Sequence, residues 1–235
     1  MNTARFRFFA ELNDFLPSSR KNVFFSYDFE GSPAIKHLIE ALGVPHPEVG
    51  RILANGGEAR LTYRVQPADQ IFVYPADGQA AIEPRFVLDN HLGKLAIYLR
   101  ILGFDALYSN TFQDDELAEI AGSGQHILLT RDRRLLMRRV VQHGYCLRSL
   151  RPEAQIAEVV RRYRLWGEIQ PFRRCLRCNH PLQPVSKELI LHRLESLTKI
   201  YYDEFHLCPS CDQIYWKGSH YERMQELVGR IKRER

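Results

Sequence analysis

The sequence contains no long hydrophobic run. Across its 235 residues, no apolar stretch approaches the ~18 residues that a membrane-spanning helix needs. In the N-terminal segment MNTARFRFFAEL, Arg5 and Arg7 interrupt the apolar residues, so the uninterrupted core of a signal peptide is missing. We therefore expect a cytoplasmic protein that does not enter a membrane.

Glycine and proline occur in ordinary proportions, without the excess of a low-complexity chain, and cysteines are few. The chain has 14 glycines and 12 prolines, and 45% of its residues are hydrophobic. This composition argues against a disordered chain and indicates globular material, long enough for one large domain or for two or three small ones. The chain has five cysteines, and since nothing points to secretion, disulfide bonds are the weaker explanation for them.

Positive charge is scarce in the first third of the chain and abundant afterwards. Residues 1–84 carry 8 Lys and Arg against 10 Asp and Glu, a balance of −2, whereas the later residues carry 25 against 18, a balance of +7. Two clusters stand out, namely Arg131, Arg133, Arg134, Arg138 and Arg139, and then Arg161, Arg162, Arg164, Arg173, Arg174 and Arg177. Such density favours polyanion binding; a solvated helix face is the alternative.

The first 76 residues predict a β-grasp, that is, ubiquitin-like, domain. Residues 5–12 and 21–29 alternate apolar and polar side chains on either side of a Pro-Ser-Ser turn, as in a hairpin. The segment that opens with Ser32-Pro33 has apolar residues at helical spacing and ends at Gly43, which favours a left-handed cap. Further strands are expected in RILANG, ARLTYRV and DQIFVYP. The resulting element order is that of a β-grasp.

From residue 85 the pattern changes to alternating short strands and helices. The preceding stretch, PADGQAAIEP, is rich in small residues and proline, and we interpret residues 77–84 as a linker. Residues 85–166 alternate strands such as RFVLD and HILLT with helices such as HLGKLAIYLRILG and RDRRLLMRRVVQHG. The buried stripe of the first helix is expected to be Leu92, Leu95, Leu99 and Leu102. Repeated strand–helix units predict a parallel sheet with helices on its faces.

Residues 167–235 contain two Cys-x-x-Cys pairs. Cys175 and Cys178 form the first pair, Cys208 and Cys211 form the second, and 29 residues separate them. Four thiolates give zinc a closed tetrahedral shell. A domain of this size has too little core to be stable alone, so the metal is expected to supply folding free energy. We therefore predict a four-cysteine zinc ribbon.

The other cysteine and the nearby histidines are expected to have different roles. His180 and His206 lie beside the pairs, but four cysteines already saturate a zinc ion, so we treat both histidines as non-ligands. Cys146 lies in an apolar strand and is expected to be a buried small hydrophobe rather than a nucleophile. A final helix with one apolar face is expected to begin at a Ser219 cap.

Aspartates follow the predicted strands of the central domain or open its helices. Asp89 ends RFVLD, Asp114 and Asp115 open a helix, and Asp132 follows HILLT. The carboxyl ends of parallel strands face one crevice, so these acids are expected to converge and to hold magnesium or manganese. Such a metal can activate water and hold a scissile phosphate. The expected substrate contacts are Lys94, Thr130, Arg131, Arg133 and Arg134.

Each of these residues also has a purely structural explanation. Helix capping is the alternative for Asp89, Asp114 and Asp115. An ion pair with a neighbouring arginine is the alternative for Asp132, and Lys94 could simply extend from the apolar face of its helix. The joint placement of the acids at equivalent edges favours the metal site.

Taken together, these segments resemble a known family. The stretch from FVLDNHLGKLAIYLRILGFDA through DDELAEIAGSGQHILLTRDRRLL resembles the PIN-like ribonucleases called the Mut-seven C-terminal domain. The ending CPSCDQIYWKGSHYERM is similar to the zinc-ribbon extension of prokaryotic members. Those members often carry a ubiquitin-like domain in front, which FRFFAELNDFLP, IEALGVPHPEVG and IFVYP resemble. The resemblance covers nearly the whole chain.

The resemblance implies metal-dependent cleavage of RNA. PIN nucleases of the toxin type carry an acid at the end of the first strand, which matches Asp89. They carry another in a D-x-x-x-A pattern, which matches Asp114 with Ala118, and a third in a T-x-D motif, which matches Thr130 with Asp132.

Two departures from the toxin pattern bear on activity. Arg134 stands where a further acid is frequent, and the usual glutamate of a middle helix has no counterpart, because the chain between Gly103 and Asp114 is too short for that helix. The site could therefore bind one metal or bind weakly, and Asp115 or Glu116 could compensate.

We therefore predict an α/β protein with a β-grasp domain at 1–76, a linker at 77–84, a PIN-like parallel α/β domain at 85–166, and a zinc ribbon with a C-terminal helix at 167–235. The leading hypothesis is a metal-dependent ribonuclease. The alternatives are a catalytically weak or inactive adaptor that binds RNA or ribosomes, and a DNA nuclease or phosphatase that uses the same site. Without a free diglycine terminus, the ubiquitin-like domain resembles a fused adaptor for a protein partner rather than a sulfur carrier.

Overall fold

The computed structural model describes residues 1–78 and 83–234. It divides into two compact units, Met1–Ile82 with Gln113–Leu147, and Glu83–Phe112 with Arg148–Arg235. Part of the predicted linker, residues 79–82, lies outside the described residues. Among the described helices, none combines the length and the apolar character that crossing a bilayer would require.

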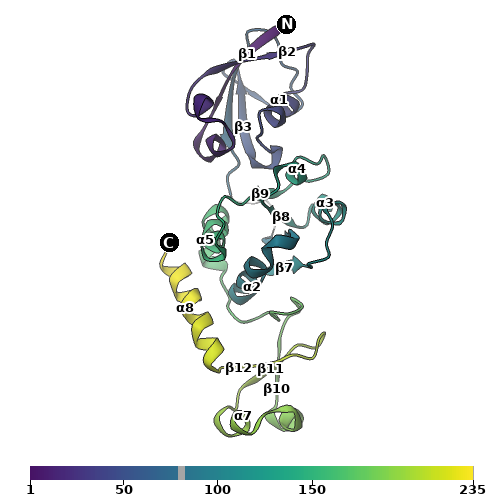
Figure 1. Cartoon of the computed structure of the whole chain (residues 1–235), viewed down its shortest axis with the longest axis vertical. Coiled ribbons are helices and arrows are strands. Elements are labelled where there is room, and N and C mark those ends of the chain that lie inside the picture. Colours follow the sequence, from purple (N-terminus) through teal and green to yellow (C-terminus); the bar gives the residue numbers. More distant parts are fainter. Residues whose placement is uncertain (79–82, 235) are drawn as a thin grey trace. The chain divides into compact units, whose positions relative to one another are not determined.

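The N-terminal part of the first unit is a β-grasp domain, as predicted. Its strands are β1 (Asn2–Phe8), β2 (Phe25–Phe29), β3 (Val49–Ala54), β4 (Gly57–Ala59) and β5 (Gln70–Pro75). They form a sheet in the order β2-β1-β5-β3-β4, in which β1 runs parallel to β5 and antiparallel to β2. Figure 1 shows α1 (Ile35–Ala41) lying against this sheet. Short 3-10 helices complete the domain, namely η1 (Ala10–Phe15), η2 (Ser18–Arg20) and η3 (His46–Glu48).

Alternation along β1 explains how this sheet obtains its core. Phe6 and Phe8 are buried, while Arg5 and Arg7 point to the opposite side, where Arg5 lies over the ring of Phe24 at 5.0 Å. The two-residue period of a strand places alternate side chains on one face, so the apolar set meets α1 as a single layer.

One predicted strand of this domain is wrong. ARLTYRV was expected to be extended, but β4 ends at Ala59 and the chain then turns. The buried carboxylate of Asp69 accepts hydrogen bonds from the Tyr63 hydroxyl (3.0 Å), the Gln66 amide (2.8 Å) and the Asn55 side chain (2.7 Å). These bonds hold the segment as a loop, because they satisfy polar groups that a strand would pair with a neighbour.

The rest of the first unit contains a parallel strand pair and two helices. Its elements are α3 (Asp114–Gly122), β8 (Ile127–Thr130), α4 (Arg133–Leu136) and β9 (Gly144–Cys146), and β8 runs parallel to β9. Every residue of both strands is buried, as expected for a parallel sheet that is covered on both faces.

The helix predicted over residues 131–144 is much shorter than expected. It ends at Leu136, since the chain has to turn back to enter β9. Val141 is buried, and its carbonyl oxygen lies 2.8 Å from His46 Nε2 rather than within a continuing helix. At Gly144 a Cβ atom would lie 2.5 Å from the Leu136 Cδ2 atom and 3.2 Å from the Leu128 carbonyl oxygen, so a larger residue would require Leu136 to move.

In the second unit, β6 (Arg85–Leu88) runs parallel to β7 (Asp105–Tyr108). The connection consists of η4 (Asn90–Leu92) and α2 (Gly93–Leu102), and α5 (Pro152–Tyr163) and η5 (Leu165–Glu168) follow later in the chain. The predicted stripe of Leu92, Leu95, Leu99 and Leu102 is buried. Gly103 ends α2 with a φ of 96°, and a Cβ there would lie 2.1 Å from the Gln170 carbonyl oxygen, so only glycine fits.

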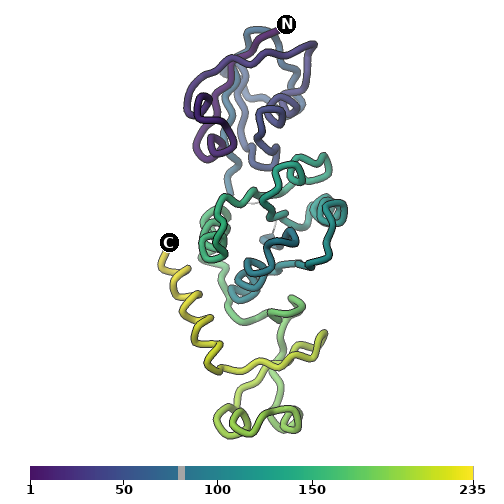
Figure 2. Tube along the Cα trace, viewed as in Figure 1, coloured from purple at the N-terminus to yellow at the C-terminus, as the bar shows by residue number. Residues whose placement is uncertain are grey.

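The C-terminal part of the second unit is built around a small antiparallel sheet in the order β10-β11-β12. Its elements are β10 (Gln183–Val185), α6 (Lys187–Ile190), η6 (Leu191–Arg193), α7 (Ser196–Tyr201), β11 (Phe205–Leu207), β12 (Ile214–Trp216) and α8 (Ser219–Arg233). Figure 2 traces the chain from β10 through α6 and α7 to β11. The core consists of Ile190, Leu194, Phe205 and Ile214.

The predicted Ser219 cap of the last helix is displaced by one residue. Gly218 occupies the N-cap position, and Ser219 is the first helical residue. The Gly218 amide donates to the Trp216 carbonyl (3.0 Å), and a Cβ on Gly218 would lie 3.0 Å from Trp216 Nε1. The indole therefore favours glycine at the turn.

Candidate metal and catalytic sites

Each Cys-x-x-Cys pair forms the same tight turn. In the first, the Asn179 amide donates to the Cys175 carbonyl (2.9 Å), and in the second the Asp212 amide donates to the Cys208 carbonyl (2.9 Å). Asn179 and Asp212 both adopt left-handed backbone conformations, with φ of 71° and 59°. Asn and Asp tolerate this conformation better than most residues. The sequence therefore encodes two equivalent turns.

The four thiol groups of these turns converge. Cys178 Sγ lies 3.3 Å from Cys208 Sγ, Cys175 Sγ lies 3.5 Å from Cys211 Sγ, and all four sulfurs lie within 4.8 Å of one another. Sulfurs bound to one zinc at about 2.3 Å would lie roughly 4 Å apart. Among residues 1–78 and 83–234, this is the group of His, Cys, Asp or Glu side chains arranged so that three or more could hold one metal ion.

The pKa values of the thiols show why a cation fits this cluster. Burial acts to raise the pKa of Cys175, but hydrogen bonds from Tyr215 and from the Cys178 and Arg177 amides bring it down to about 6. Burial and hydrogen bonds with the neighbouring thiols raise the pKa of Cys211 to about 12, and burial also raises that of Cys208. Without a cation the cluster therefore resists full ionisation, whereas a divalent metal would stabilise four thiolates.

Arg100 lies beneath the first cysteine turn and was not identified from the sequence. Its side chain is 4% exposed. The guanidinium donates to the Leu176 and Arg177 carbonyls (2.9 and 3.1 Å), which lie between the two cysteines, and also to the Ala106 carbonyl (3.1 and 2.8 Å). Its only signal in the sequence is a single cation inside the apolar stretch LAIYLRILG. Through these hydrogen bonds Arg100 connects the first cysteine turn to β7.

Asn179 provides a second connection between the cysteine turn and β7. Its side-chain oxygen accepts from the Ala106 amide (3.1 Å), and its side-chain nitrogen donates to the Asp105 carboxylate (2.6 Å). Arg174 pairs with the same carboxylate at 3.2 Å. The cysteine cluster is therefore anchored by polar groups on the first β–α–β segment of its own unit.

Asp132 is held by the backbone at the end of β8. It is the N-cap of α4, and its Oδ1 accepts from the Arg134 amide at 2.7 Å. Its own amide donates to the Thr130 hydroxyl at 2.9 Å. Thr130 is fully buried, whereas Asp132 is exposed. Asp132 thus caps a helix instead of forming the ion pair considered as an alternative, and Thr130 orients it from within.

Asp114 and Asp115 lie in the first turn of α3, but neither caps it. Gln113 is the N-cap, and Glu116 completes a capping box by accepting from the Gln113 amide at 2.8 Å. The guanidinium of Arg138 forms an ion pair with Asp115 and lies 3.8 Å from Asp114. The carboxylate of Glu116, a possible substitute ligand, is therefore engaged by the helix terminus, and a cation already faces both aspartates.

Asp89 follows β6 in the second unit and is buried. It occupies the N-cap position of η4 without a side-chain cap hydrogen bond. Lys94 lies in the first turn of α2, is exposed, and has its Nζ 5.4 Å from the centre of the Tyr98 ring. The meeting of Asp89 with Asp114 and Asp132 stays a prediction.

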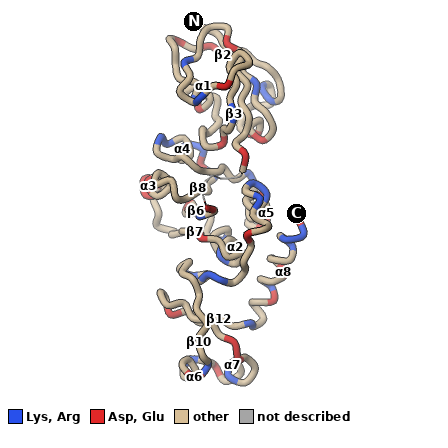
Figure 3. The backbone as a smooth tube through the Cα atoms, turned by 180° about the vertical axis from the view of Figure 1, so that it is seen from behind, with Lys and Arg blue, Asp and Glu red and all other residues tan. Residues whose placement is uncertain are grey.

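The arginines that follow β8 have different surroundings. Figure 3 shows Lys and Arg along α4, α5 and α8. Arg131 and Arg134 are exposed. Arg133 donates to the Phe15 carbonyl at 3.2 Å and lies over the Phe15 ring at 4.9 Å. Arg133 therefore binds the ubiquitin-like domain, while the other two arginines point to solvent.

Two further contacts within the first unit link the ubiquitin-like domain to the β8–β9 pair. The carboxylate of Glu48, which is fully buried, accepts from the Cys146 amide at 2.6 Å. His46 lies 2.8 Å from both the Val141 carbonyl oxygen and a Glu40 carboxylate oxygen. Cys146 is buried, as predicted. Through His46 and Glu48, the ubiquitin-like domain thus packs against residues 141–146, which follow the segment that carries Asp132. The sequence did not indicate these contacts.

Comparison with known families identifies both parts of the chain. Residues 84–228 match the model described as Mut7-C RNAse domain. Residues 1–80 match the model described as Mut7-C ubiquitin. No curated protein matches the chain.

Two solved structures match about a third of the chain. The crystal structure of the small archaeal modifier protein 1 of H. volcanii is 18% identical and aligns over 32% of this chain and 98% of its own, with a TM-score of 0.26. A crystal structure of SAMP1 from Haloferax volcanii is 19% identical over 32% of this chain and 94% of its own, also with a TM-score of 0.26. The assignment rests on the family models. Since the first of these matches more than half of the residues, the chain belongs to the Mut7-C RNAse domain family.

Proposed function

We propose that this protein is a metal-dependent ribonuclease that cleaves RNA phosphodiester bonds. The observation that carries the proposal is the match of residues 84–228 to an RNAse domain. That range contains Asp89 and Asp132, which follow the buried strands β6 and β8, and Asp114, which opens α3. Acids at strand ends and helix starts are well placed to line the crevice of a parallel α/β fold.

We propose that Asp89, Asp114 and Asp132 together hold magnesium or manganese, with Asp115 as an additional acid. Carboxylate oxygens are the ligands that these hard cations prefer. When bound, the cation would supply water activation and charge stabilisation at the scissile phosphate.

The chain's own residues would orient the reaction. The Arg134 amide and the Thr130 hydroxyl fix Asp132, so its second carboxylate oxygen is available to a cation. Arg131 and the side chain of Arg134 are exposed and would bind the flanking phosphates. Arg133 would contribute less than predicted, because Phe15 holds its guanidinium.

We also propose that Cys175, Cys178, Cys208 and Cys211 hold a structural zinc ion. The donor set is four sulfurs with no room for a substrate ligand, which is typical of closed structural sites. We propose the following domain limits: the ubiquitin-like domain at 1–76, the linker at 77–84, the PIN-like domain at 85–166 and the zinc ribbon at 167–235.

A cleavage assay tests the ribonuclease proposal. Purified protein is incubated with end-labelled single-stranded RNA and manganese, and wild type is compared with Asp89→Asn and Asp132→Asn. Loss of a metal ligand is expected to lower the rate by 100-fold or more, because about 3 kcal/mol of charge stabilisation would be lost. Asp203→Asn is the matched control, since Asp203 is exposed and pairs with Lys187. Equal cleavage by wild type and Asp89→Asn would refute the proposal.

The competing proposal is a catalytically weak adaptor that binds RNA or ribosomes. The ion pairs of Arg138 with Asp114 and Asp115 favour it, because a side-chain cation already neutralises the expected ligands. RNA binding that persists in EDTA without turnover would support the adaptor. The DNase or phosphatase alternative is separated by competition between RNA and DNA substrates.

The ubiquitin-like domain is proposed to bind a protein partner as a fused adaptor. The last strand of this domain along the chain is β5. Its final residue, Pro75, is followed by the central part of the chain, so the domain has no free C-terminus for conjugation. The contacts of Phe15, His46 and Glu48 with the α4–β9 region would leave the rest of its surface for that partner.

A further inference from the structure

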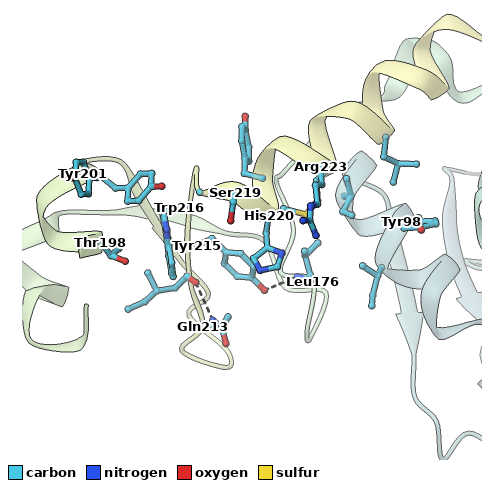
Figure 4. Close-up of a pocket in the computed structure, with 18 of the residues that line it drawn as sticks. Tyr98, Leu176, Thr198, Tyr201, Gln213, Tyr215, Trp216, Ser219, His220 and Arg223 are labelled. Atoms are coloured by element: carbon cyan, nitrogen blue, oxygen red, sulfur yellow. Dashed lines mark hydrogen bonds between the residues drawn. The ribbon is translucent and has the colours of Figure 1, made fainter. Parts of the chain in front are cut away.

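The second unit contains a hollow lined by none of the aspartates of the proposed acidic site. It has a volume of about 860 Å³ and is bounded by residues of α2, α7, β12 and α8. Figure 4 shows Tyr201 at one end, Tyr98 at the other, and Arg223 between them. All of its lining residues belong to one compact unit. We call this hollow the α8 groove.

Aromatic side chains dominate the α8 groove. They are Tyr98, Tyr201, Tyr202, Tyr215, Trp216 and Tyr221. Tyr215 has a structural role, because its hydroxyl lies 3.1 Å from Cys175 Sγ and accepts from the Leu176 amide. Tyr201 and Trp216, in contrast, are 71% and 40% exposed. Tyr201 ends α7 and Trp216 ends β12, and large aromatic rings presented to solvent in this way are typical of binding surfaces.

The charged side chains that line the α8 groove are all positive. Lys94, Arg223 and Arg230 line it together with His220, and no Asp or Glu is among the described lining residues. Within residues 1–78 and 83–234, no ion pair engages the three cations. Lys94 is partly balanced by Glu153, which accepts a hydrogen bond from Tyr98 at 2.7 Å, so Arg223 and Arg230 provide the stronger attraction for an anionic ligand.

We propose that the α8 groove binds single-stranded RNA, with bases stacked on Trp216 and Tyr201 and phosphates bound by Lys94, Arg223 and Arg230. Base faces stack on aromatic rings only when the strand is unpaired, which excludes a duplex. The combination of rings and cations along one groove is the arrangement that single-strand binding proteins use. The choice of RNA as the polyanion depends on the proposed ribonuclease function, for which this groove would hold the substrate strand.

The test is the affinity of the full-length, zinc-loaded protein for a 5′-labelled 12-nucleotide oligouridylate. Fluorescence anisotropy is measured without magnesium or manganese, so that no cleavage occurs. Trp216→Ala is expected to weaken binding about tenfold or more, as for loss of one stacked base, and Trp216→Phe to restore most of the affinity. Arg223→Ala is expected to reduce the slope of log affinity against log salt by about 0.7.

Matched controls keep the result interpretable. Leu189→Ala removes another exposed apolar side chain of the same unit, and Lys232→Ala removes another exposed cation of α8; neither residue lines the groove. Both are expected to bind RNA as the wild type does. Zinc content and circular dichroism establish that the Trp216 and Arg223 variants remain folded.

Two results would overturn the inference. One is wild-type RNA affinity in both Trp216→Ala and Arg223→Ala. The other is quenching of the fluorescence that Trp216 contributes, taken as the difference between wild type and Trp216→Phe, by a polyglutamate peptide but not by the oligouridylate, which would identify an acidic protein segment as the ligand. The ribonuclease proposal fails separately: if Asp89→Asn cleaves RNA normally while Trp216→Ala loses binding, the groove assignment stands and the catalytic assignment falls.

Discussion

The ubiquitin-like domain buries whole layers of apolar side chains, whereas the cysteine-containing part of the second unit buries few. In the former, Phe6, Phe8, Leu12, Ile35, Ile39 and Ile71 are all fully buried. In the latter, the core is Ile190, Leu194, Phe205 and Ile214 around a three-stranded sheet. Hydrophobic stabilisation scales with buried apolar area, so the two parts need different sources of stability.

The difference shows what the four thiols contribute. Cys175 and Cys208 are fully buried and occupy space that a larger core would fill with apolar side chains. Arg100 is buried against the first cysteine turn, where its positive charge would partly balance the two excess negative charges of a zinc–tetrathiolate centre. A metal ion bound by these four thiols, as proposed, would replace part of the missing hydrophobic burial.

Removing the metal is expected to have the largest effect. Structural zinc contributes on the order of 10 kcal/mol of folding free energy in small domains, so chelation or Cys208→Ser should unfold the ribbon and leave the ubiquitin-like domain folded. Hydrogen exchange of the β10–β12 amides and Trp216 fluorescence would report the change. Cys146→Ser is the control, because this cysteine is not in the cluster and zinc content should be unchanged. An unaltered melting curve after chelation would contradict the metal's structural role.

The converse experiment removes part of the hydrophobic core. Phe6→Ala is expected to destabilise the ubiquitin-like domain by about 3–5 kcal/mol, the usual result of a large cavity. In this variant the amide hydrogens of β1 and β5 should exchange faster with solvent, while the zinc content should stay the same as in the wild type. Val23→Ala, at a position that is 46% exposed, is the control and should change little. Loss of zinc in Phe6→Ala would show that the two regions do not fold independently.

The smallest effect on stability is expected from removing a single hydrogen bond, the one that joins Tyr98 of α2 to Glu153 of α5. The Tyr98 hydroxyl donates to Glu153 at 2.7 Å, and burial followed by this bond raises the pKa of Tyr98 from 10.0 to about 12. Because the pKa of Tyr98 is about 12 in the folded state and about 10 in the unfolded state, the protonated hydroxyl stabilises the fold below pH 10. This contribution to the free energy of unfolding is lost as the pH rises through about 12. Urea unfolding of wild type and Tyr98→Phe should therefore differ at pH 8 and converge towards pH 12. A difference that does not depend on pH would refute this account.

Local sequence patterns were reliable where one interaction dominates. The alternation around Phe6, the leucine stripe of α2 and the spacing of the cysteines each depend on a short-range rule; the first two predictions are confirmed, and the four thiols lie together as the spacing predicted. The errors occurred where packing in the folded chain overrode the local pattern. Asp69 turned a predicted strand into a loop, and the return to β9 at Gly144 shortened a predicted helix.

For the candidate sites, the sequence determined which residues are candidates: two cysteine pairs whose following Asn179 and Asp212 favour tight turns, and aspartates placed after apolar strands, whose catalytic role stays a prediction. Only the tertiary structure decided what surrounds them. Arg100 lies under the cysteine turn, Arg138 faces Asp114, and Phe15 holds Arg133. Turn geometry depends on neighbours in the chain, whereas the partner of a charged side chain is set by packing between segments far apart in sequence, which no local pattern records.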